Sequence, residues 1–177
     1  EVIKNGELTA SVSSDNLEII WDNRGRFTKI YRINGVGKRQ IDFVGNLRTV
    51  LFCPQDIEIA TDSPSIRRKY LDSVLNQIFK DYRLATHIYD KALRQRNRLL
   101  WRIREEGLDR SQLTYWDELL ISNGKVIHDK RKDYLKYLDL PYDHSIISEE
   151  RLARYANEEI GAATTLVGPH RDDFKVV

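Results

Sequence analysis

The segment from Ser63 to Glu106 decides the fold. It reads SPSIRRKYLDSVLNQIFKDYRLATHIYDKALRQRNRLLWRIREE and contains no Gly and no Pro after Pro64. Ser63 is a suitable N-cap, and Pro64 fits the first helical position, where a missing N–H costs nothing. Within this segment apolar residues recur at helical spacings and form one stripe: Ala85, Tyr89, Ala92, Leu99 and Ile103. The segment therefore predicts one long helix or two helices in series.

A second striped helix follows the first. Residues 107–111 break the pattern, and Pro141 ends the new one. Its apolar positions are Leu113, Trp116, Leu120, Ile127, Tyr134 and Leu138. Two striped helices joined by a short polar turn predict an antiparallel helical hairpin.

Arg96 interrupts the first stripe, where an apolar residue is expected. With the turn near Asp109, antiparallel pairing places Arg96 opposite Asn123, and a matched polar layer of this kind fixes the register of two helices. The alternative is that the Arg96 side chain extends along the helix to solvent.

The C-terminal part predicts one further helix and one further strand. Ser148 is a suitable N-cap for a helix that runs to about Ile160, with Gly161 as its stop. The β-branched segment 164–167 predicts a strand that runs into Gly168-Pro169-His170.

The first 53 residues predict an antiparallel meander. Short β-branched and aromatic runs are separated by turn clusters, and they lie at Leu8–Val12, Leu17–Trp21, Phe27–Ile33 and Val50–Cys53. Asn34-Gly35 is typical of a type I′ turn, which needs positive φ at both central residues. The fold class is therefore α+β.

Composition excludes several classes of protein. The chain has 177 residues, with 29 Lys+Arg against 27 Asp+Glu, so its net charge of +2 does not resemble that of a histone-like polycation. The single cysteine, Cys53, excludes a disulfide framework and favours a small buried apolar role. No apolar run is long enough for a membrane helix, which indicates a soluble, cytosolic protein. The chain has no Met even at position 1, so we expect an interior or processed segment of a longer protein.

Three strings imitate known motifs. Gly35-Val36-Gly37-Lys38 resembles the end of a phosphate-binding P-loop, but Arg32 and Arg39 stand where Gly and Ser or Thr are needed, so we interpret it as a hairpin turn. His170-Arg171-Asp172 lacks the companion Asn of a kinase catalytic loop. His128-Asp129 has too few neighbouring ligands for a metal site and is interpreted as a solvated helix face.

Positive charge is concentrated in residues 64–106. Eleven Lys/Arg against five Asp/Glu give this segment +6. On a helix, Lys91, Arg94, Arg98 and Arg102 share one stripe beside the apolar stripe, which suits contact with a phosphate backbone. Arg67 and Arg68 are further candidate DNA contacts. The alternative is a solvated face, or arginines paired with acids of another helix.

Five strings follow one another along nearly the whole chain. They are residues 50–56 (VLFCPQD), 63–72 (SPSIRRKYLD), 93–100 (LRQRNRLL), 116–117 (WD) and 168–174 (GPHRDDF). In this order the strings are quite specific in combination, and they resemble the RecF family of bacterial DNA replication and repair proteins. The string Arg32-Ile33-Asn34-Gly35 also fits that family.

The resemblance implies an ATP-binding head of the ABC type with an inserted helical arm. It implies residues 1–60 as the β-rich part of the head, 61–144 as the arm, and 145–177 as the return to the head. It also implies a homodimer formed around ATP and Mg²⁺, binding to double-stranded DNA, and cooperation with RecO and RecR in loading the recombinase at gaps and stalled forks. The alternative function is a non-enzymatic helical hairpin that serves as a protein-interaction scaffold.

The chain departs from the family pattern in two ways. The family's Walker A loop would precede residue 1, and its signature and Walker B motifs would follow residue 177, so we do not expect this chain alone to hydrolyse ATP. The connection between Leu138 and Ile146 is also shorter than the family's usual connection.

Two sites remain as candidates under the resemblance. Gln55 stands at the predicted junction of head and arm, where ABC proteins place a glutamine that reaches Mg²⁺ and the attacking water; RecF proteins often have glutamate there, and Gln55 could instead cap the helix at Ser63. Residues 170–173 follow a Gly-Pro turn, and their alternating charges predict a local salt-bridged cluster or a role near the nucleotide or dimer interface.

Overall fold

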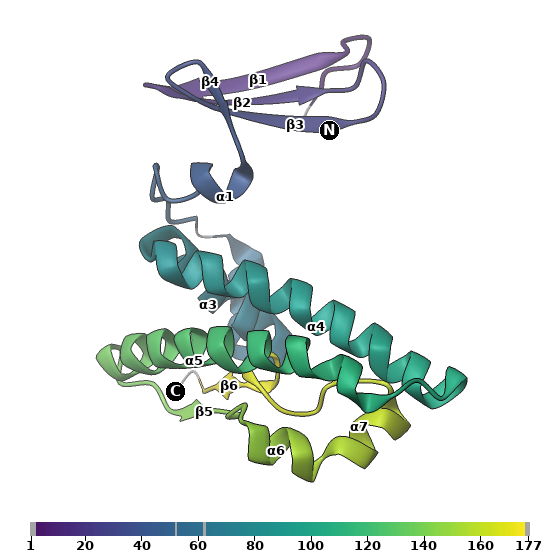
Figure 1. Cartoon of the computed structure of the whole chain (residues 1–177). Helices are drawn as coiled ribbons and strands as arrows, with labels where there is room; N and C mark the ends of the chain where they lie inside the picture. Colours follow the sequence, from purple (N-terminus) through teal and green to yellow (C-terminus); the bar gives the residue numbers. More distant parts are fainter. Residues whose placement is uncertain (1–2, 52, 62, 176–177) are drawn as a thin grey trace. The chain divides into compact units, whose positions relative to one another are not determined.

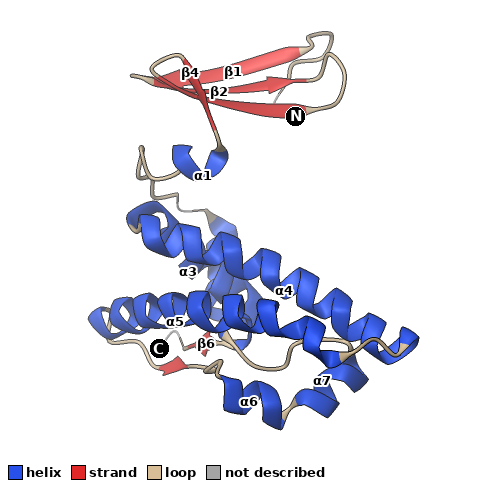
Figure 2. Cartoon of the chain, viewed as in Figure 1, coloured by secondary structure: helices blue, strands red, loops and turns tan. Residues whose placement is uncertain are grey.

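The computed structural model describes residues 3–51, 53–61 and 63–175 and divides into two compact units, Glu1–Thr49 and Val50–Val177. Unit 1 is the first of these and unit 2 the second. Figure 1 shows the helices and strands of both along the chain, and Figure 2 shows that unit 1 is mainly strand and unit 2 mainly helix. The α+β class is confirmed.

Unit 1 is a four-stranded antiparallel meander in the order β1-β2-β3-β4. Its strands are β1 (Thr9–Ser14), β2 (Leu17–Asp22), β3 (Thr28–Ile33) and β4 (Val36–Lys38), and they are followed by the one-turn helix α1 (Gln40–Phe43). The first three strands were predicted within two residues at each end. β4 and α1 were not predicted, because three or four residues carry too little periodicity to detect.

The turn between β3 and β4 forms as predicted. Asn34 has φ +52° and Gly35 has φ +74°, so both central residues occupy the left-handed region. The string Gly35-Val36-Gly37-Lys38 is thus part of a β-hairpin, as interpreted from the sequence.

One face of the sheet is apolar. The register places Val12 beside Ile19, and Ile19 beside Tyr31, so these side chains share a face. Helix α1 contributes Phe43, whose ring lies 5.2 Å from that of Tyr31. Val12 nevertheless remains 61% exposed, and none of the described residues 3–49 is buried.

Unit 2 begins with short elements and continues with helices. Its elements are the 3₁₀ helix Pro54–Ile57, α2 (Glu58–Thr61), α3 (Pro64–Ile78), α4 (Lys80–Glu106), the 3₁₀ helix Arg110–Leu113, α5 (Thr114–Tyr137), β5 (Tyr142–Asp143), α6 (Glu149–Arg154), α7 (Ala156–Ala162), the 3₁₀ helix Pro169–Arg171 and β6 (Asp173–Phe174). The first helical segment is therefore two helices in series, separated at Phe79 by an extended backbone with φ −116° and ψ 117°. The predicted strand Val50–Cys53 is wrong at its described positions 50, 51 and 53, where no strand forms; Phe52 lies outside the described residues.

Helices α4 and α5 form the predicted antiparallel hairpin and run side by side (Figure 1). Arg96 contacts Asp117 and Tyr82 contacts Arg131, so positions early in α4 meet positions late in α5. Gly107 ends α4 in the left-handed conformation at φ +68°, as helix C-termini commonly require.

The segment after the hairpin folds back onto it. Ser148 caps α6 as predicted, accepting from the Arg151 amide, but the expected helix breaks at Tyr155 into α6 and α7. Gly161 does not end the helix, because α7 continues to Ala162 and closes at Ala163 with φ +50°. β5 and β6 pair Tyr142 with Phe174.

The predicted strand at 164–167 is wrong. The Thr164 amide donates to the Glu159 backbone carbonyl, and the next two amides donate to side chains of the helices, not to another strand. Thr165 N–H donates to Asn97 Oδ1 at 2.8 Å, and Leu166 N–H donates to Glu159 Oε1 at 2.8 Å. The segment is therefore held in place as a loop.

The core of unit 2 lies between α3, α4, α5 and the returning segment. Its buried apolar side chains are Leu71, Leu75, Tyr82, Ala85, Tyr89, Ala92, Leu120, Ile127, Leu135, Ile147, Leu152, Val167 and Phe174. Leu100, Ile103 and Leu113 form a second cluster toward the turn of the hairpin. Among the helices of the described residues, none has the length and apolarity needed to span a bilayer.

Candidate functional site

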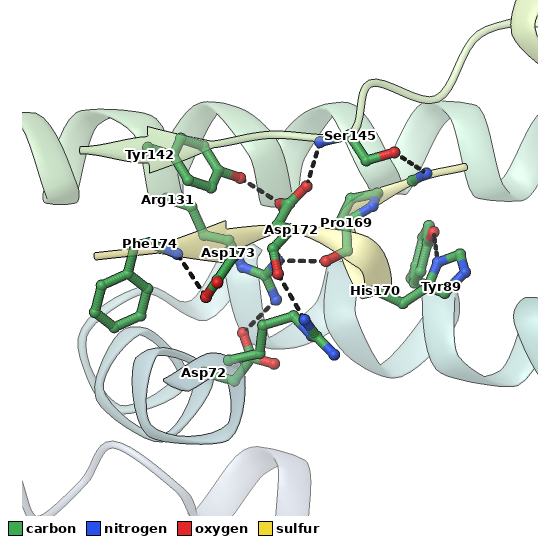
Figure 3. Close-up of polar contacts among 12 residues, drawn as sticks. Asp72, Tyr89, Arg131, Tyr142, Ser145, Pro169, His170, Asp172, Asp173 and Phe174 are labelled. Carbon is green, nitrogen blue, oxygen red and sulfur yellow. Dashed lines mark hydrogen bonds and ion pairs between the residues drawn. The ribbon is translucent and has the colours of Figure 1, made fainter. Parts of the chain in front are cut away.

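Arg131 is the centre of a buried polar network that joins four segments of unit 2. The side chain is 3% exposed, and each of its three nitrogens donates a hydrogen bond. Nε donates to the Tyr82 hydroxyl at 2.9 Å, Nη1 to the Pro169 carbonyl at 2.7 Å, and Nη2 to Asp72 Oδ1 at 2.7 Å. Figure 3 shows Asp72 of α3, Arg131 of α5 and Pro169 of the C-terminal segment converging.

Asp172 is the buried anion opposite Arg131. Its Oδ2 lies 3.0 Å from Arg131 Nη1 and also accepts the Tyr142 hydroxyl (Figure 3). Its Oδ1 accepts the Ser145 amide at 2.7 Å. With 1% of its surface exposed, this carboxylate exchanges its water shell for three donors, which is what a buried charge requires.

Electrostatics keep this network charged. Burial alone would lower the pKa of the Arg131 guanidinium, but the charges around it, Asp72 first, raise that pKa well above its ordinary value. Burial raises the pKa of the Tyr82 and Tyr142 hydroxyls, so both remain protonated donors. The network therefore holds these segments together through the charge of Arg131 and its hydrogen bonds.

His170 lies in a second part of the same site. Its Nε2 lies 3.0 Å from the Thr165 carbonyl, which can only accept, so Nε2 carries the proton and Nδ1 accepts from the Tyr89 hydroxyl at 2.8 Å. Burial lowers the pKa of His170 to about 4, so the ring is neutral near pH 7. Gly168 allows this approach: its φ is +124°, and a Cβ at that position would collide with the Tyr89 hydroxyl.

The charges of residues 170–173 do not form the predicted local cluster. Asp173 instead accepts two hydrogen bonds from Arg67, at 2.7 and 2.9 Å, and these lower the pKa of its carboxyl. Arg68 Nη1 donates to the Asp172 carbonyl at 2.6 Å. Both arginines belong to α3, about a hundred positions earlier in the chain. A helix packed against the turn can direct its side chains at these acidic residues, whereas charges adjacent within a short turn cannot face one another.

Arg96 is neither paired with Asn123 nor exposed, so both interpretations from the sequence are wrong. It is 2% exposed and donates from Nε to Asp117 at 2.6 Å. Its Nη1 lies 2.7 Å from Glu159 Oε2 as an ion pair and donates to Thr165 Oγ1 at 2.9 Å. The polar layer thus exists, but it joins the hairpin to α7. Asn123 donates to the Leu119 carbonyl of its own helix.

The outer face of α4 carries the predicted basic stripe. Lys91, Arg94 and Arg98 are exposed, and Arg102 is half-exposed and paired with Glu106 at 2.8 Å. Among the described residues, the side chains of Lys91 and Arg98 form no ion pair or hydrogen bond, and the only electrostatic partner of the Arg94 side chain is Asp90. Arg67 and Arg68, by contrast, are engaged with Asp173 and Asp172. We name Lys91, Arg94, Arg98 and Arg102 the basic stripe.

A cavity of about 260 Å³ lies beside the Arg131 network. Arg68 and Arg131 line it together with Asp72 and Asp90, so opposite charges face one another within it. Burial, and then the charge of Asp72, raise the pKa of Asp90. His170 also lines the cavity, but both of its ring nitrogens already have protein partners, so it is not free to activate a nucleophile there. The charged residues of the wall therefore favour binding of a polar group in the cavity over catalysis.

The remaining candidates have structural positions. His128 is half-buried, not a solvated group, and stacks on Tyr142 at 5.8 Å. Cys53 is a free, half-buried thiol. Gln55 lies in the 3₁₀ helix Pro54–Ile57, and its side chain lies outside the described residues.

The described residues do not fit an ATP–Mg²⁺ site. Within 3–51, 53–61 and 63–175, no three His, Cys, Asp or Glu side chains gather as metal ligands. The one P-loop-like string is a β-hairpin turn. We therefore derive no chemical step through a nucleotide from this chain.

Sequence reasoning missed Arg131 and Glu159. A signal for Arg131 was present, because it lies four residues after Ile127, on the apolar stripe of α5, just as Arg96 lies on the stripe of α4. Of the apolar positions expected on the second stripe, Trp116 and Tyr134 are half-buried and Leu138 is 43% exposed. Glu159 had no local signal, since its burial depends on α7 folding back onto the hairpin.

Comparison with known proteins gives consistent relatives, although no protein-family model matches the chain. The chain is 36% identical to the DNA replication and repair protein RecF of Herpetosiphon aurantiacus over 175 residues, covering 84% of this chain and 46% of the relative. It is 33% identical to the RecF of Thermomicrobium roseum over 218 residues, covering 96% of this chain and 54% of the relative. The chain thus spans about half the length of the curated relatives it matches.

Solved structures agree with these relatives. The recombination mediator protein RecF with ATP, in the RecFOR pathway, aligns with a TM-score of 0.85 at 29% identity, covering 98% of this chain and 57% of that chain. Its ATPrS counterpart aligns with a TM-score of 0.82. The alignment to the T. roseum relative has 218 positions against 177 residues here, so at least 41 of its positions have no counterpart in this chain.

Proposed function

Because the chain belongs to the RecF family of DNA replication and repair proteins, we propose that it is part of an ATP-dependent protein that binds double-stranded DNA during recombinational repair. The protein dimerises when it binds ATP and Mg²⁺ in the cytoplasm. It acts with RecO and RecR to load the recombinase at gaps and stalled replication forks. In this proposal residues 1–60 belong to the head, 61–144 form the arm, and 145–177 return to the head.

The observation that carries the proposal is the basic stripe on α4. Lys91, Arg94 and Arg98 are exposed and, within the described part of the chain, form no ion pair like those of Arg67 and Arg96. Cations left without internal partners are available to neutralise phosphates and release their counterions. Since the stripe lies on a helix fixed by a buried core, its charges keep a constant spacing for a duplex backbone.

The network has a positioning role in this proposal. Arg131 and Arg96 hold the returning segment 165–174 against α3, α4 and α5. A change in the arm would therefore be transmitted to the segment that leads back to the head. Gln55 stays a candidate for the nucleotide-linked position.

Binding of a short fluorescent duplex at low salt tests the proposal. We expect the full chain to bind it, and Arg94→Glu with Arg98→Glu to weaken binding by about tenfold or more, because two phosphate contacts become repulsive. The matched control is Lys132→Glu with Lys136→Glu, which makes the same charge change on exposed positions of α5. An equal loss in both double variants, or no loss in the first, would contradict the assignment to α4.

A protein-interaction scaffold is the second candidate function. A cavity of about 300 Å³ lies between the hairpin and α6–α7, and its wall includes Leu100, Leu113, Ile121, Leu152 and Ile160. Charged residues also line this cavity, among them Arg110 and Glu149, and a cavity of this size can accept a partner's side chain. Absence of any DNA affinity, together with retained binding of RecO or RecR, would favour this alternative.

A further inference from the structure

We propose that Trp101 is a stacking site for an unpaired base of single-stranded DNA, beside the basic stripe on α4. The inference rests on the proposed DNA-binding function and deepens it by assigning to this chain a residue that contacts a base. The exposure of the Trp101 side chain on α4 suggests the site.

Trp101 is unusually exposed for its type. Its surface is 47% accessible, whereas Leu100 beside it is 1% accessible and belongs to the core. A large aromatic side chain left in water loses the stabilisation that burial would give it. The position is well ordered by its helix, because α4 runs from Lys80 to Glu106 without a break.

The neighbours of Trp101 on α4 are cationic. Side chains three or four positions apart on a helix are adjacent, which places Arg98 and Arg104 on either side of Trp101, with Arg94 one further turn along the same face. Arg104 is anchored by Glu105 and the Gly161 carbonyl, so that Glu105 is neutralised locally. Arg98 has no partner among the described residues. An exposed ring flanked by a free guanidinium is the combination that binds single strands, in which the cation holds a phosphate and the ring stacks on a base.

The exposed ring of Tyr115 lacks this setting. Tyr115 is 60% exposed, but its neighbours on α5 are Glu118 and Leu119, and its ring packs edge-on against Trp116 at 5.0 Å. Of these two rings, Trp101 is therefore the one with cationic neighbours, as binding of a polyanion requires.

Two single-stranded probes test the proposal with the full chain: a 15-residue oligothymidylate and the same backbone with abasic sites. The abasic strand keeps the phosphates and removes the bases. We expect Trp101→Leu to weaken oligothymidylate binding about tenfold, within the range of one stacked base, and to leave binding of the abasic strand within about twofold. Trp101→Phe should retain most of the affinity, and Tyr115→Leu should change nothing.

Salt separates stacking from charge. Trp101→Leu should lower oligothymidylate affinity at every salt concentration without changing the slope, whereas Arg98→Gln should reduce the slope by about 0.7. Equal affinity of wild type and Trp101→Leu for oligothymidylate would overturn the stacking site. So would an equal loss on both probes. If Arg94→Glu with Arg98→Glu affects neither duplex nor single strand, the proposed DNA-binding function itself fails, and that outcome is distinct from failure of Trp101 alone.

Discussion

Unit 1 and unit 2 differ in how much apolar surface they bury in a core of their own. Unit 1 has a regular sheet and a well-formed turn, yet none of its described residues is buried and its apolar face stays open. Unit 2 has only the two-stranded sheet of β5 and β6 among its described residues. It nevertheless buries thirteen apolar residues in one cluster, and it buries Arg96 and Arg131 beside carboxylates. The difference teaches that correct secondary structure does not make a self-sufficient unit, whereas long-range packing does.

The largest expected effect comes from separating the units. Residues 50–177 alone should keep a cooperative thermal transition in the helical circular dichroism signal, because their core is internal. Residues 1–49 alone should show no cooperative transition, because a sheet with one uncovered apolar face is marginal in water. A cooperative transition of the isolated sheet would remove the contrast between the units.

Arg131→Met should be the most damaging single change in unit 2. It leaves Asp72 and Asp172 without their shared cation, and breaking a buried ion pair in this way lowers the free energy of unfolding by about 3–5 kcal/mol. Arg102→Met, which breaks the exposed pair with Glu106 in the same unit, is the matched control and should have little effect on the free energy of unfolding. Urea denaturation of both variants provides the comparison, and a loss below about 1 kcal/mol for Arg131→Met would mean that the network contributes little.

Acid should destabilise unit 2 through His170. Its pKa of about 4 in the folded chain lies below the ordinary value of 6.5, so the unfolded chain takes up the proton first as pH falls. The free energy of unfolding should therefore decrease from pH 6.5 to pH 4, by roughly 3 kcal/mol in total. His128, whose pKa is also lowered, first by burial and then by His144, adds to the same window, so the measurement uses a His128→Gln background.

The His170→Gln variant isolates this contribution. Its amide can still donate to the Thr165 carbonyl, but it does not titrate. The decrease between pH 6.5 and pH 4 should largely disappear in that variant. An unchanged pH profile would contradict the lowered pKa of His170, because a histidine with the same pKa in the folded and unfolded chains adds no pH dependence to stability.

Gly168→Ala should have a smaller but clear effect. The backbone at φ +124° and ψ 174° is a conformation that only glycine adopts readily, and such strain costs about 1–3 kcal/mol. The new methyl group would also displace the Tyr89 hydroxyl from His170. Gly161→Ala, at a position with open space around it, is the control, and equal stability of the two variants would contradict the need for glycine at 168.

The sequence predicted the parts of this molecule that depend on local periodicity. The hairpin of α4 and α5, the Asn34-Gly35 turn and the cap at Ser148 all follow from patterns of a few adjacent residues. The basic stripe was found for the same reason, since its spacing is that of one helix.

The remaining parts depend on contacts between distant segments, which no local pattern reports. The partners of Arg96 include Glu159 and Thr165, more than sixty positions away, so its pairing with Asn123 could not be corrected from the sequence of the hairpin alone. The segment 164–167 resembles a strand in composition, but the side chains of Asn97 and Glu159 take its backbone amides. Both predictions were therefore wrong for the same reason, because polar contacts with other segments set the structure at these positions.

The salt dependence of duplex DNA binding tests the central claim, that the outer face of α4 is the nucleic-acid contact of this chain. The affinity of the full chain is measured from about 50 to 200 mM salt and compared with that of the triple variant Lys91→Gln, Arg94→Gln and Arg98→Gln. Each lost phosphate contact removes about 0.9 from the slope of log affinity against log salt, so the account predicts a slope reduced by about 2.7. An unchanged slope, with wild-type affinity at low salt, would contradict it.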